Sequence, residues 1–355
     1  MADAIEKLPP YLPREIIFNI LINIPAQVLL EVVRHVCKQW YDIVSDPLFA
    51  KAHCQKSSLG FLFQNSKNYC QVNYIDVDVP IVKMKTKTKT TKVENPSEAT
   101  ILCSLNGLVL LSYSTYGEII LHVVNPMTKE KISLPPVMVG LGPKSASLAI
   151  NSSGHYKVVH VSKQVQIRVF TIGVDKAWRL IDLQGIPNSS TMNYILESPY
   201  CCRQYIYWFQ YYSSFGLALD VDTETIYRFT GPLYERHSVV NMETSIGITI
   251  ISEARTLMVR KLTDVKSSEW TEFARINVIP LYSRFSKVFG STFNNDIYPV
   301  GLFGGDFWFY CFIGGKYVVV RKKLADKKRF DFFEIERGTL HPHASTFVSP
   351  EKLIA

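Results

Sequence analysis

The chain has 355 residues, of which 47% are hydrophobic and 20% are charged. Its 39 Lys and Arg residues and 31 Asp and Glu residues give a formal net charge of +8. This apolar content with a modest charge excludes a mainly disordered chain, and the composition also excludes collagen-like and coiled-coil chains. At roughly 100–200 residues per domain, the length allows two or three domains, or one small domain beside a large one.

The first residues and the cysteines are typical of an intracellular protein. Residues 1–10 carry Asp3 and Glu6 and lack the pattern of a secretory signal. Polar residues and a proline interrupt the apolar stretch 16–36, so we expect neither a transmembrane helix nor a membrane partner. The seven cysteines form no C-x-x-C pair and no cluster at zinc spacing, so we expect reduced thiols and no metal site.

Glycine usage divides the chain near residue 60. The first glycine is Gly60, so all 18 glycines lie in the later part of the chain. Glycine is costly inside helices and common in tight turns, so this distribution predicts helices followed by a turn-rich β region. The sequence therefore predicts an α+β protein with more than one domain.

The early segment predicts three short helices. Apolar residues between Ile16 and Ile24 fall on one helical stripe. Pro25 ends that helix and can begin a second, whose stripe runs from Val28 to Trp40. A third short element ends near Pro47. Helices this short cannot bury all their apolar surface among themselves, so part of it should face a partner or the β region.

Downstream, strand-like segments recur at intervals of about 40–50 residues, a period typical of propeller blades. They lie at 60–64, 107–113, 148–161, 205–210, 246–251, 307–312 and 345–350. Hairpin patterns follow most of them. Six such units would fill residues 57–350. A last strand near Phe347 could pair with the first near Phe61, closing the ring and removing its edges.

The N-terminal residues resemble the F-box. The matching residues are Leu12, Pro13, Glu15, Ile16, Ile20, Leu21, Pro25, Val36, Cys37, Lys38, Trp40, Pro47 and Phe49. This resemblance implies binding to a Skp-type adaptor, which links such proteins to a cullin ubiquitin ligase. The residues expected to bind the adaptor are Leu12, Pro13, Ile16, Ile17, Ile20, Leu21, Ile24, Pro25, Val36, Cys37 and Trp40.

One departure from the F-box pattern lies between Pro25 and Cys37. That interval is one residue longer than the pattern, which would rotate one side of the second helix by about 100°. The change affects the expected contacts of Val32 and Val33 more than those of the first helix.

The later residues resemble the F-box-associated domain of the large plant F-box families. The matching runs are NGLVLL at 106–111, VVNPMTKEKISLPP at 123–136 and HYKVVHV at 155–161, with Val124 where tryptophan is usual. Later landmarks match more loosely. A kelch propeller is the alternative suggested by the glycine pairs 304–305 and 314–315, although two pairs inside one unit are not a repeat.

Two basic segments could indicate nucleic-acid binding. Residues 83–92 hold five lysines and no acid, and residues 316–329 hold seven Lys or Arg residues against Asp326. Alternating Lys and Thr suits an exposed edge strand or a loop, and no nucleic-acid motif accompanies either segment. We therefore favour solvent-exposed charge over a nucleic-acid partner.

Other candidate sites have structural interpretations. His341 and His343 flank Pro342 without enough further ligands for a metal, so we interpret them as a loop entering the closing strand. Cys201 and Cys202 should point to opposite faces of a strand as small buried side chains. The aromatic run 205–212 is apolar on both faces, as expected for a strand between two blades. No hydrolase, nucleotide-binding or metalloprotease motif occurs, so we expect no catalytic site and no cofactor.

The sequence predicts a three-helix F-box at residues 8–53 and an all-β, propeller-like domain of about six blades at residues 55–350. The resemblance implies a non-catalytic substrate-recognition subunit of an SCF-type ubiquitin ligase, in the nucleus or cytoplasm, which holds a protein target for ubiquitination and proteasomal degradation. The alternative is a stand-alone propeller that binds a small ligand or glycan, with the F-box as a structural cap. An enzyme with an unrecognised site ranks last. We expect a short link near residues 55–58 and direct contacts between the helices and the first blade.

Overall fold

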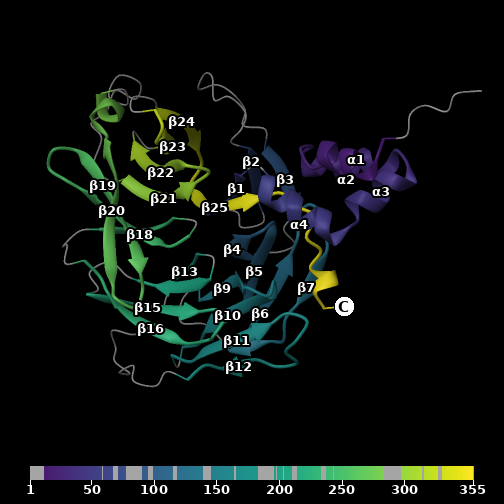
Figure 1. The fold of residues 1–355 in the computed structure, drawn as a ribbon. Coiled ribbons are helices and arrows are strands. Elements are labelled where there is room, and N and C mark those ends of the chain that lie inside the picture. Colours follow the sequence, from purple (N-terminus) through teal and green to yellow (C-terminus); the bar gives the residue numbers. More distant parts are fainter. Residues whose placement is uncertain are drawn as a thin grey trace, which may run out of the picture.

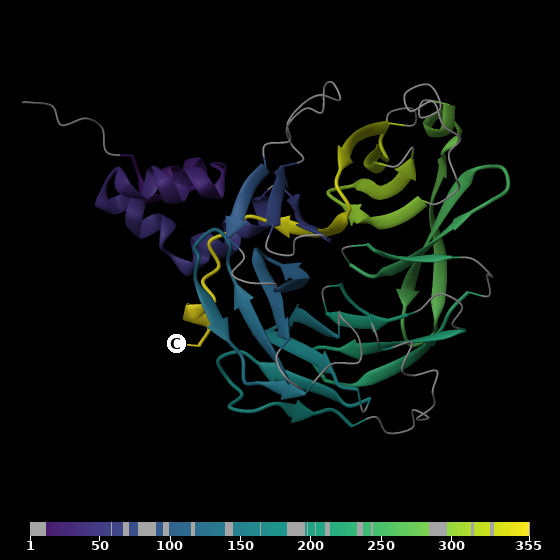
Figure 2. The same cartoon turned by 180° about the vertical axis from the view of Figure 1, so that it is seen from behind.

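The computed structural model consists of short helices followed by a ring of β-sheets (Figure 1). The described residues are 12–57, 59–66, 71–76, 90–94, 99–114, 118–138, 145–163, 165–182, 196, 198–202, 204–209, 214–232, 237–242, 244–283, 297–313, 316–326 and 330–354. The helices lie outside the ring, beside the first sheets, and the view from behind shows the same arrangement (Figure 2). The architecture is therefore α+β with a propeller-like β domain.

Prolines lie at the start of three helices in the helical region. Its elements are α1 (Arg14–Leu21), α2 (Ala26–Glu31), the 3₁₀ turn η1 (Val33–His35), α3 (Lys38–Val44) and α4 (Pro47–Lys56). Pro13 and Pro25 immediately precede α1 and α2, where the missing N–H removes no helical hydrogen bond. A fourth helix, α4, follows the three predicted ones. Pro47 was expected only to follow a helix, but it is also the first residue of α4. Asp46 caps α4 by accepting a hydrogen bond from the Leu48 N–H at 2.9 Å.

The predicted second helix is interrupted. The chain leaves helical geometry at Val32, whose φ and ψ are −123° and −60°, and it is extended at Cys37 before α3 begins. The 3₁₀ turn η1 lies between these two points, within the Pro25–Cys37 interval. Val33 is buried, whereas Val32 is 57% exposed.

The strands form six four-stranded, antiparallel units, called blades 1 to 6, in the described part of the chain. Blade 1 consists of β25 (Gly338–Ala344), β1 (Leu59–Asn65), β2 (Gln71–Asp76) and β3 (Thr90–Glu94). Blade 2 consists of β4 (Thr100–Leu105), β5 (Leu108–Ser114), β6 (Glu118–Val124) and β7 (Lys131–Ser133). Blade 3 consists of β9 (Ala146–Ile150), β10 (Tyr156–Val161), β11 (Ile167–Thr171) and β12 (Arg179–Leu180). A short strand, β8 (Val137–Met138), also pairs with β6.

The later blades repeat the same meander. Blade 4 consists of β13 (Pro199–Cys202), β14 (Tyr205–Trp208), β15 (Phe215–Asp220) and β16 (Ile226–Thr230). Blade 5 consists of β17 (Ser238–Asn241), β18 (Ile246–Ile251), β19 (Thr256–Asp264) and β20 (Glu269–Asn277). Blade 6 consists of β21 (Ile297–Phe303), β22 (Asp306–Ile313), β23 (Lys316–Lys323) and β24 (Phe330–Ile335). Blades 5 and 6 are joined by a parallel contact between Asn241 and Gly301. The chain ends with the 3₁₀ turn η2 (Glu351–Leu353).

The ring closes between the two ends of the β region. β25 pairs with β1 in an antiparallel register that sets Phe61 opposite Pro342. The prediction of a C-terminal closing strand is confirmed, but the strand ends at Ala344 and does not include Phe347. The interpretation of His341 and His343 as a loop before that strand is wrong, because both lie within β25. Proline is compatible with this position because β25 pairs with a strand on one side only.

The apolar cores lie between neighbouring blades. Tyr207 and Phe209 face a core shared by blades 4 and 5, and Ile206 and Trp208 face the core shared by blades 3 and 4. The prediction that this run is apolar on both faces is thus confirmed over residues 205–209, whereas residues 210–213 lie outside the described part of the chain.

Replacing Phe61 by alanine should destabilise the closed ring. Phe61 is fully buried, and its ring centroid lies 5.0 Å from that of Trp308 in blade 6. Removing a buried phenylalanine ring typically costs about 3–5 kcal/mol. Urea unfolding followed by tryptophan fluorescence should show a loss of this size. Phe273→Ala is the control, since Phe273 is 42% exposed on the outer strand β20; equal losses in both variants would contradict the assignment.

Candidate partner-binding surface

The outer side of the helical region exposes apolar side chains. Ile16 and Ile20 lie four residues apart on α1, and Leu12 lies two residues before its start; the three side chains are 48–50% exposed. Together with three further exposed valines they form what we call the exposed helical surface: Leu12, Ile16, Ile20, Val28, Val32 and Val36. A stripe of aliphatic side chains on a solvent-facing helix is typical of a protein–protein interface.

The inner side of α1 belongs to the helical core. Ile17 and Leu21 are 4% and 0% exposed and pack in the cluster that holds Leu29, Ile43 and Phe49. Neighbouring positions on a helix point about 100° apart, so Ile16 faces solvent while Ile17 faces the core.

The structure divides the eleven residues expected to bind an adaptor into three groups. The exposed ones are Leu12, Pro13, Ile16, Ile20, Pro25, Val36 and Cys37. Ile24 and Trp40 are half-buried, and Ile17 and Leu21 are buried, so the last two support the surface from within. Val28 and Val32 are also exposed, although neither was on the expected list. Tyr41 and Leu48 are also exposed, and no periodicity pointed to them.

The helical core is completed by residues of the β region. Phe347 belongs to the helical cluster, and Met127 from the turn between β6 and β7 packs against it. The Phe347 ring centroid lies 4.9 Å from that of His53 and 6.3 Å from that of Phe49, both in α4. The expected contact between helices and propeller therefore exists, but it uses the segment after β25 and a turn of blade 2.

His53 connects several parts of this junction. Its Nε2 lies 2.9 Å from the carbonyl oxygen of Ile24, and its Nδ1 lies 3.0 Å from the hydroxyl of Ser57. Burial lowers the pKa of His53 below its usual range. Since α4 ends at Lys56 and β1 begins at Leu59, the link is as short as expected, with residues 55 and 56 in the helix.

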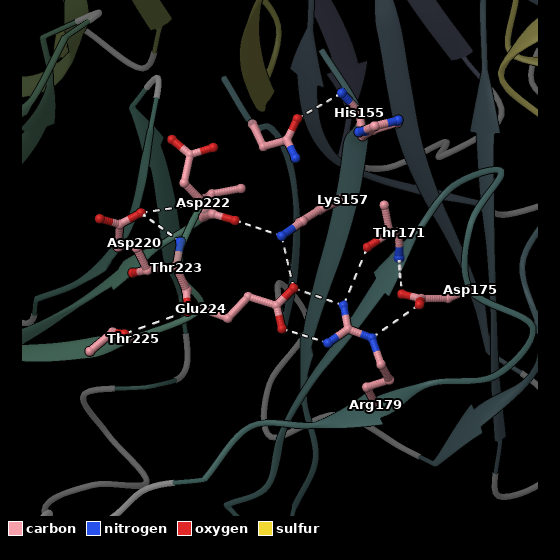
Figure 3. Close-up of polar contacts among 12 residues, drawn as sticks. His155, Lys157, Thr171, Asp175, Arg179, Asp220, Asp222, Thr223, Glu224 and Thr225 are labelled. Carbon is pink, nitrogen blue, oxygen red and sulfur yellow. Dashed lines mark hydrogen bonds and ion pairs between the residues drawn. The ribbon is translucent and has the colours of Figure 1, made fainter. Parts of the chain in front are cut away.

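Blades 3 and 4 are joined by a network of charged groups (Figure 3). Arg179 donates to both carboxylate oxygens of Glu224, at 2.6 and 2.7 Å, and its Nε donates to Asp175 at 3.0 Å. Lys157, which is nearly buried, donates to Glu224 at 2.8 Å and to the Val221 carbonyl at 2.7 Å. Hydrogen bonds from Arg179, with help from Lys157, hold the pKa of Glu224 at about 2. The network satisfies its own charges, as expected of a structural contact between blades.

Two buried histidines occupy contrasting environments. The Nδ1 of His343 lies 2.8 Å from the Ser104 hydroxyl, whereas both ring nitrogens of His160 lack a hydrogen-bond partner among the described residues. Burial lowers the pKa of each to about 4, and Arg168 adds to the effect at His160. His341 contacts Thr339, and no group of three or more potential ligands in the described residues could hold a metal ion.

The described cysteines differ in exposure: Cys37 is exposed, whereas Cys202 and Cys311 are buried. Cys202 is 1% exposed, and burial raises its pKa to about 12 and the pKa of Cys103 to about 11. Burial also raises the pKa of Cys201. The described cysteines are free thiols, and Cys70 lies outside the described residues.

The basic segments are spread over two blades. Residues 83–89 lie outside the described part of the chain, and residues 90–92 belong to β3, the outer strand of blade 1. In the second segment, Lys316 pairs with Glu334 and Arg321 pairs with Asp306. Neighbouring acids thus offset part of this positive charge. No helix in the described residues is long and apolar enough to cross a bilayer.

Aromatic side chains are partly exposed on blade 6. Tyr298 and Tyr310 stack with ring centroids 4.9 Å apart, and Phe312 and Tyr317 pair at the same distance on the adjoining strands. Tyr298 and Phe312 are 42% and 46% exposed. They are candidates for the rim of a recognition surface.

Comparisons with known proteins agree with this architecture. Residues 48–286, more than half of the chain, match the family described as F-box associated beta propeller domain, and residues 10–56 match the F-box-like family. An Arabidopsis thaliana protein provisionally named as an F-box protein is 23% identical over 194 residues, which cover 52% of each chain. The chain thus spans about half the length of this curated relative.

Solved structures resemble the fold at low sequence identity. A chain of a nidogen/laminin complex has a TM-score of 0.50 at 11% identity, covering 82% of this chain and 100% of that one. TolB from Acinetobacter baumannii has a TM-score of 0.48 at 8% identity, covering 81% of this chain and 66% of TolB. At 11% identity, the likeness to the nidogen/laminin chain concerns the fold alone.

Replacing Glu224 by glutamine should reduce the loss of stability in strong acid. The pKa of Glu224 is about 2 in the folded chain and near 4.5 when unfolded, so its contribution is present above pH 4.5 and disappears as the pH falls towards 2. Glu224→Gln should be less stable than the parent at neutral pH and should lose less stability over this interval. Unfolding free energies measured from pH 7 to pH 2 would show this, and parallel curves would contradict it.

Replacing His160 by leucine should act in a different pH range. The folded pKa of about 4 lies below the unfolded value of 6.5, so stability is full above pH 6.5 and falls as the pH drops towards 4. His160→Leu removes an unpartnered buried imidazole, so stability should rise and its pH dependence should weaken. Because His343 titrates in the same range, the slope should decrease without vanishing. Denaturant midpoints at pH 7, 6 and 5 are the measurement, and an unchanged slope would contradict the prediction.

Proposed function

The chain belongs to the F-box proteins with an F-box associated β-propeller domain, and on that premise we propose that it is the substrate-recognition subunit of an SCF-type ubiquitin ligase. The observation that carries the proposal is the exposed helical surface, where aliphatic side chains of α1 remain about half exposed while the opposite side of the helix is buried. This pattern suits a helix that has one apolar side for its own core and another for a partner.

The adaptor would bind the exposed helical surface. Ile16 and Ile20 lie on consecutive turns of α1, Leu12 lies just before its start, and Val28, Val32 and Val36 are exposed on the next segment. Aliphatic anchors of this kind dock into an apolar groove, where a few central residues carry most of the binding energy. Pro13 and Pro25 fix the start of α1 and α2 and thereby the orientation of the surface. A Skp-type adaptor held here would connect the chain to a cullin.

The chain would perform no bond chemistry itself. One end would be fixed to the ligase and the other would hold a protein target, so that ubiquitin transfer gains from the raised effective concentration of target lysines. The target would be marked for proteasomal degradation in the nucleus or cytoplasm. The propeller supports this role because binding residues are commonly carried on the loops that connect the elements of a packed scaffold.

We divide the chain into an F-box at residues 8–53 and a substrate-recognition domain at residues 55–350. Two observations bear on this division. The two family matches overlap at residues 48–56, which lie in α4, and Phe49 and His53 of α4 contact Phe347 of the later region. α4 therefore acts as the structural junction between the two parts.

The double variant Ile16→Ala/Ile20→Ala should lose adaptor binding without losing the fold. Both side chains are about half exposed, so their truncation removes little of the core. A loss of about 2 kcal/mol, typical of a hot spot, corresponds to roughly 30-fold weaker binding. The measurement is titration calorimetry with a purified plant Skp-type adaptor.

Val174→Ala is the matched control, because Val174 is an aliphatic residue of blade 3 that is 60% exposed. Its affinity for the adaptor should equal that of the parent. Ile17→Ala should instead lower the unfolding midpoint, since Ile17 is buried. An intact, folded parent chain that does not bind the adaptor would overturn the proposal and favour a stand-alone binding module.

A further inference from the structure

The described chain continues beyond the closing strand β25. Residues 345–354, which we call the C-terminal strap, leave β25, pass beside α4 and reach the neighbourhood of β7 (Figures 1 and 2). The strap contains no strand and only the short turn η2 in its described residues. Its contacts connect the helices with blades 2 and 3.

The first part of the strap is bound to two turns of blade 2. The side-chain amide of Asn125 is fully buried and donates to the carbonyl oxygens of Thr346 at 2.9 Å and Val348 at 2.8 Å. The hydroxyl of Thr346 donates to the carbonyl of Asn106 at 2.8 Å. A side chain at Gly107, whose φ is +81°, would overlap Thr346. The turns that contain Asn106-Gly107 and Asn125-Pro126 therefore bind the strap.

Phe347 lies between these two anchored residues and points to the helices. It is 8% exposed, and its ring packs on those of Phe49 and His53 in α4. The hydroxyl of Ser57, at the end of α4, lies 3.1 Å from the carbonyl oxygen of Ser345. Because its neighbours are hydrogen-bonded to blade 2, the position of Phe347 is set by the propeller, while its contacts are made with the helices.

The last part of the strap rests on blade 3. Gly173, with φ of +78°, is in contact with the backbone of Leu353, since a Cβ there would overlap the Leu353 carbonyl oxygen. The same turn is held by Asp175, which accepts from the Thr171 N–H at 2.7 Å and from Arg179 (Figure 3). Beside it lies an open cavity of about 690 Å³ lined in part by Glu351 and Ile354. This end is more exposed than residues 346–348 and should hold the strap less firmly.

We propose that the C-terminal strap fixes the orientation of the helical region on the propeller and that Phe347 is its positioning residue. The direct link comprises only residues 57 and 58, and a link alone permits rotation between domains unless an apolar interface prevents it. The strap supplies that interface by inserting Phe347 into the helical core. The description of Phe347 as a positioning residue of a ligase rests on the proposed function, whereas the mechanical role does not.

The test measures the distance between the helices and the propeller in the full chain. Spin labels would be introduced as non-canonical amino acids at Asp42 in α3 and Glu253 in the turn after β18, because both sites are exposed and Cys37 would compete for thiol labels. Double electron–electron resonance should give one narrow distance peak for the parent. In Phe347→Ala the narrow peak should be lost and replaced by a broad distribution, and Phe347→Leu should restore it.

Removal of residues 351–355 is the matched control, because it shortens the strap but leaves Asn125, Thr346 and Phe347 in place. It should retain the narrow peak. A narrow, unchanged peak in Phe347→Ala would overturn the proposal. Loss of cooperative unfolding of the propeller in that variant would also overturn it, since Phe347 would then be a general core residue.

Adaptor affinity separates this inference from the proposed function. Phe347→Ala leaves Leu12, Ile16 and Ile20 on the surface, so its affinity for a Skp-type adaptor should equal that of the parent. The distance measurement needs no adaptor, so a parent chain that fails to bind the adaptor would refute the ligase role and leave the strap result standing. Weakened adaptor binding in Phe347→Ala with an unchanged distance peak would overturn the positioning role.

Discussion

The return of the chain to its first strand is the constraint on which the rest of the structure depends. Pairing of β25 with β1 joins the two ends of the β region in blade 1, which packs against blade 6 through Phe61, Phe303 and Trp308. It also determines where the chain leaves the ring. Because β25 ends beside the start of β1, the residues that follow emerge next to α4, and only from there can Phe347 reach the helical core.

The residues that resemble family landmarks have structural roles here. Asn106 and Gly107 form the turn between β4 and β5 with φ of 51° and 81°, a conformation that suits Asn-Gly. Asn125 accepts from the Met127 N–H at 2.8 Å and so shapes the turn that presents Met127 to the helices. Neither turn belongs to a group of potential metal ligands in the described residues. Their common effect is to hold the strap.

Much of this arrangement followed from local sequence patterns, and the exceptions have physical causes. The propeller strands were predictable because turns and alternating apolar residues are local signals, as for residues 246–251. The division of α1 into Ile16 outside and Ile17 inside was not, because it depends on where α3 packs. Lys157 and Glu224 are 67 positions apart, so only the adjacency of blades reveals their pairing. The helix α4 was predictable in principle, since Asp46-Pro47 is a capping signal.

The small size of the helical unit connects the exposed helical surface with the insertion of Phe347. A helical unit of this size has too little interior to be stable alone, and turning Leu12, Ile16 and Ile20 outwards reduces that interior further. Phe347 and Met127 replace the missing apolar contacts from the opposite side. The propeller therefore supplies apolar contacts to the helical core that the outward-facing side chains do not make.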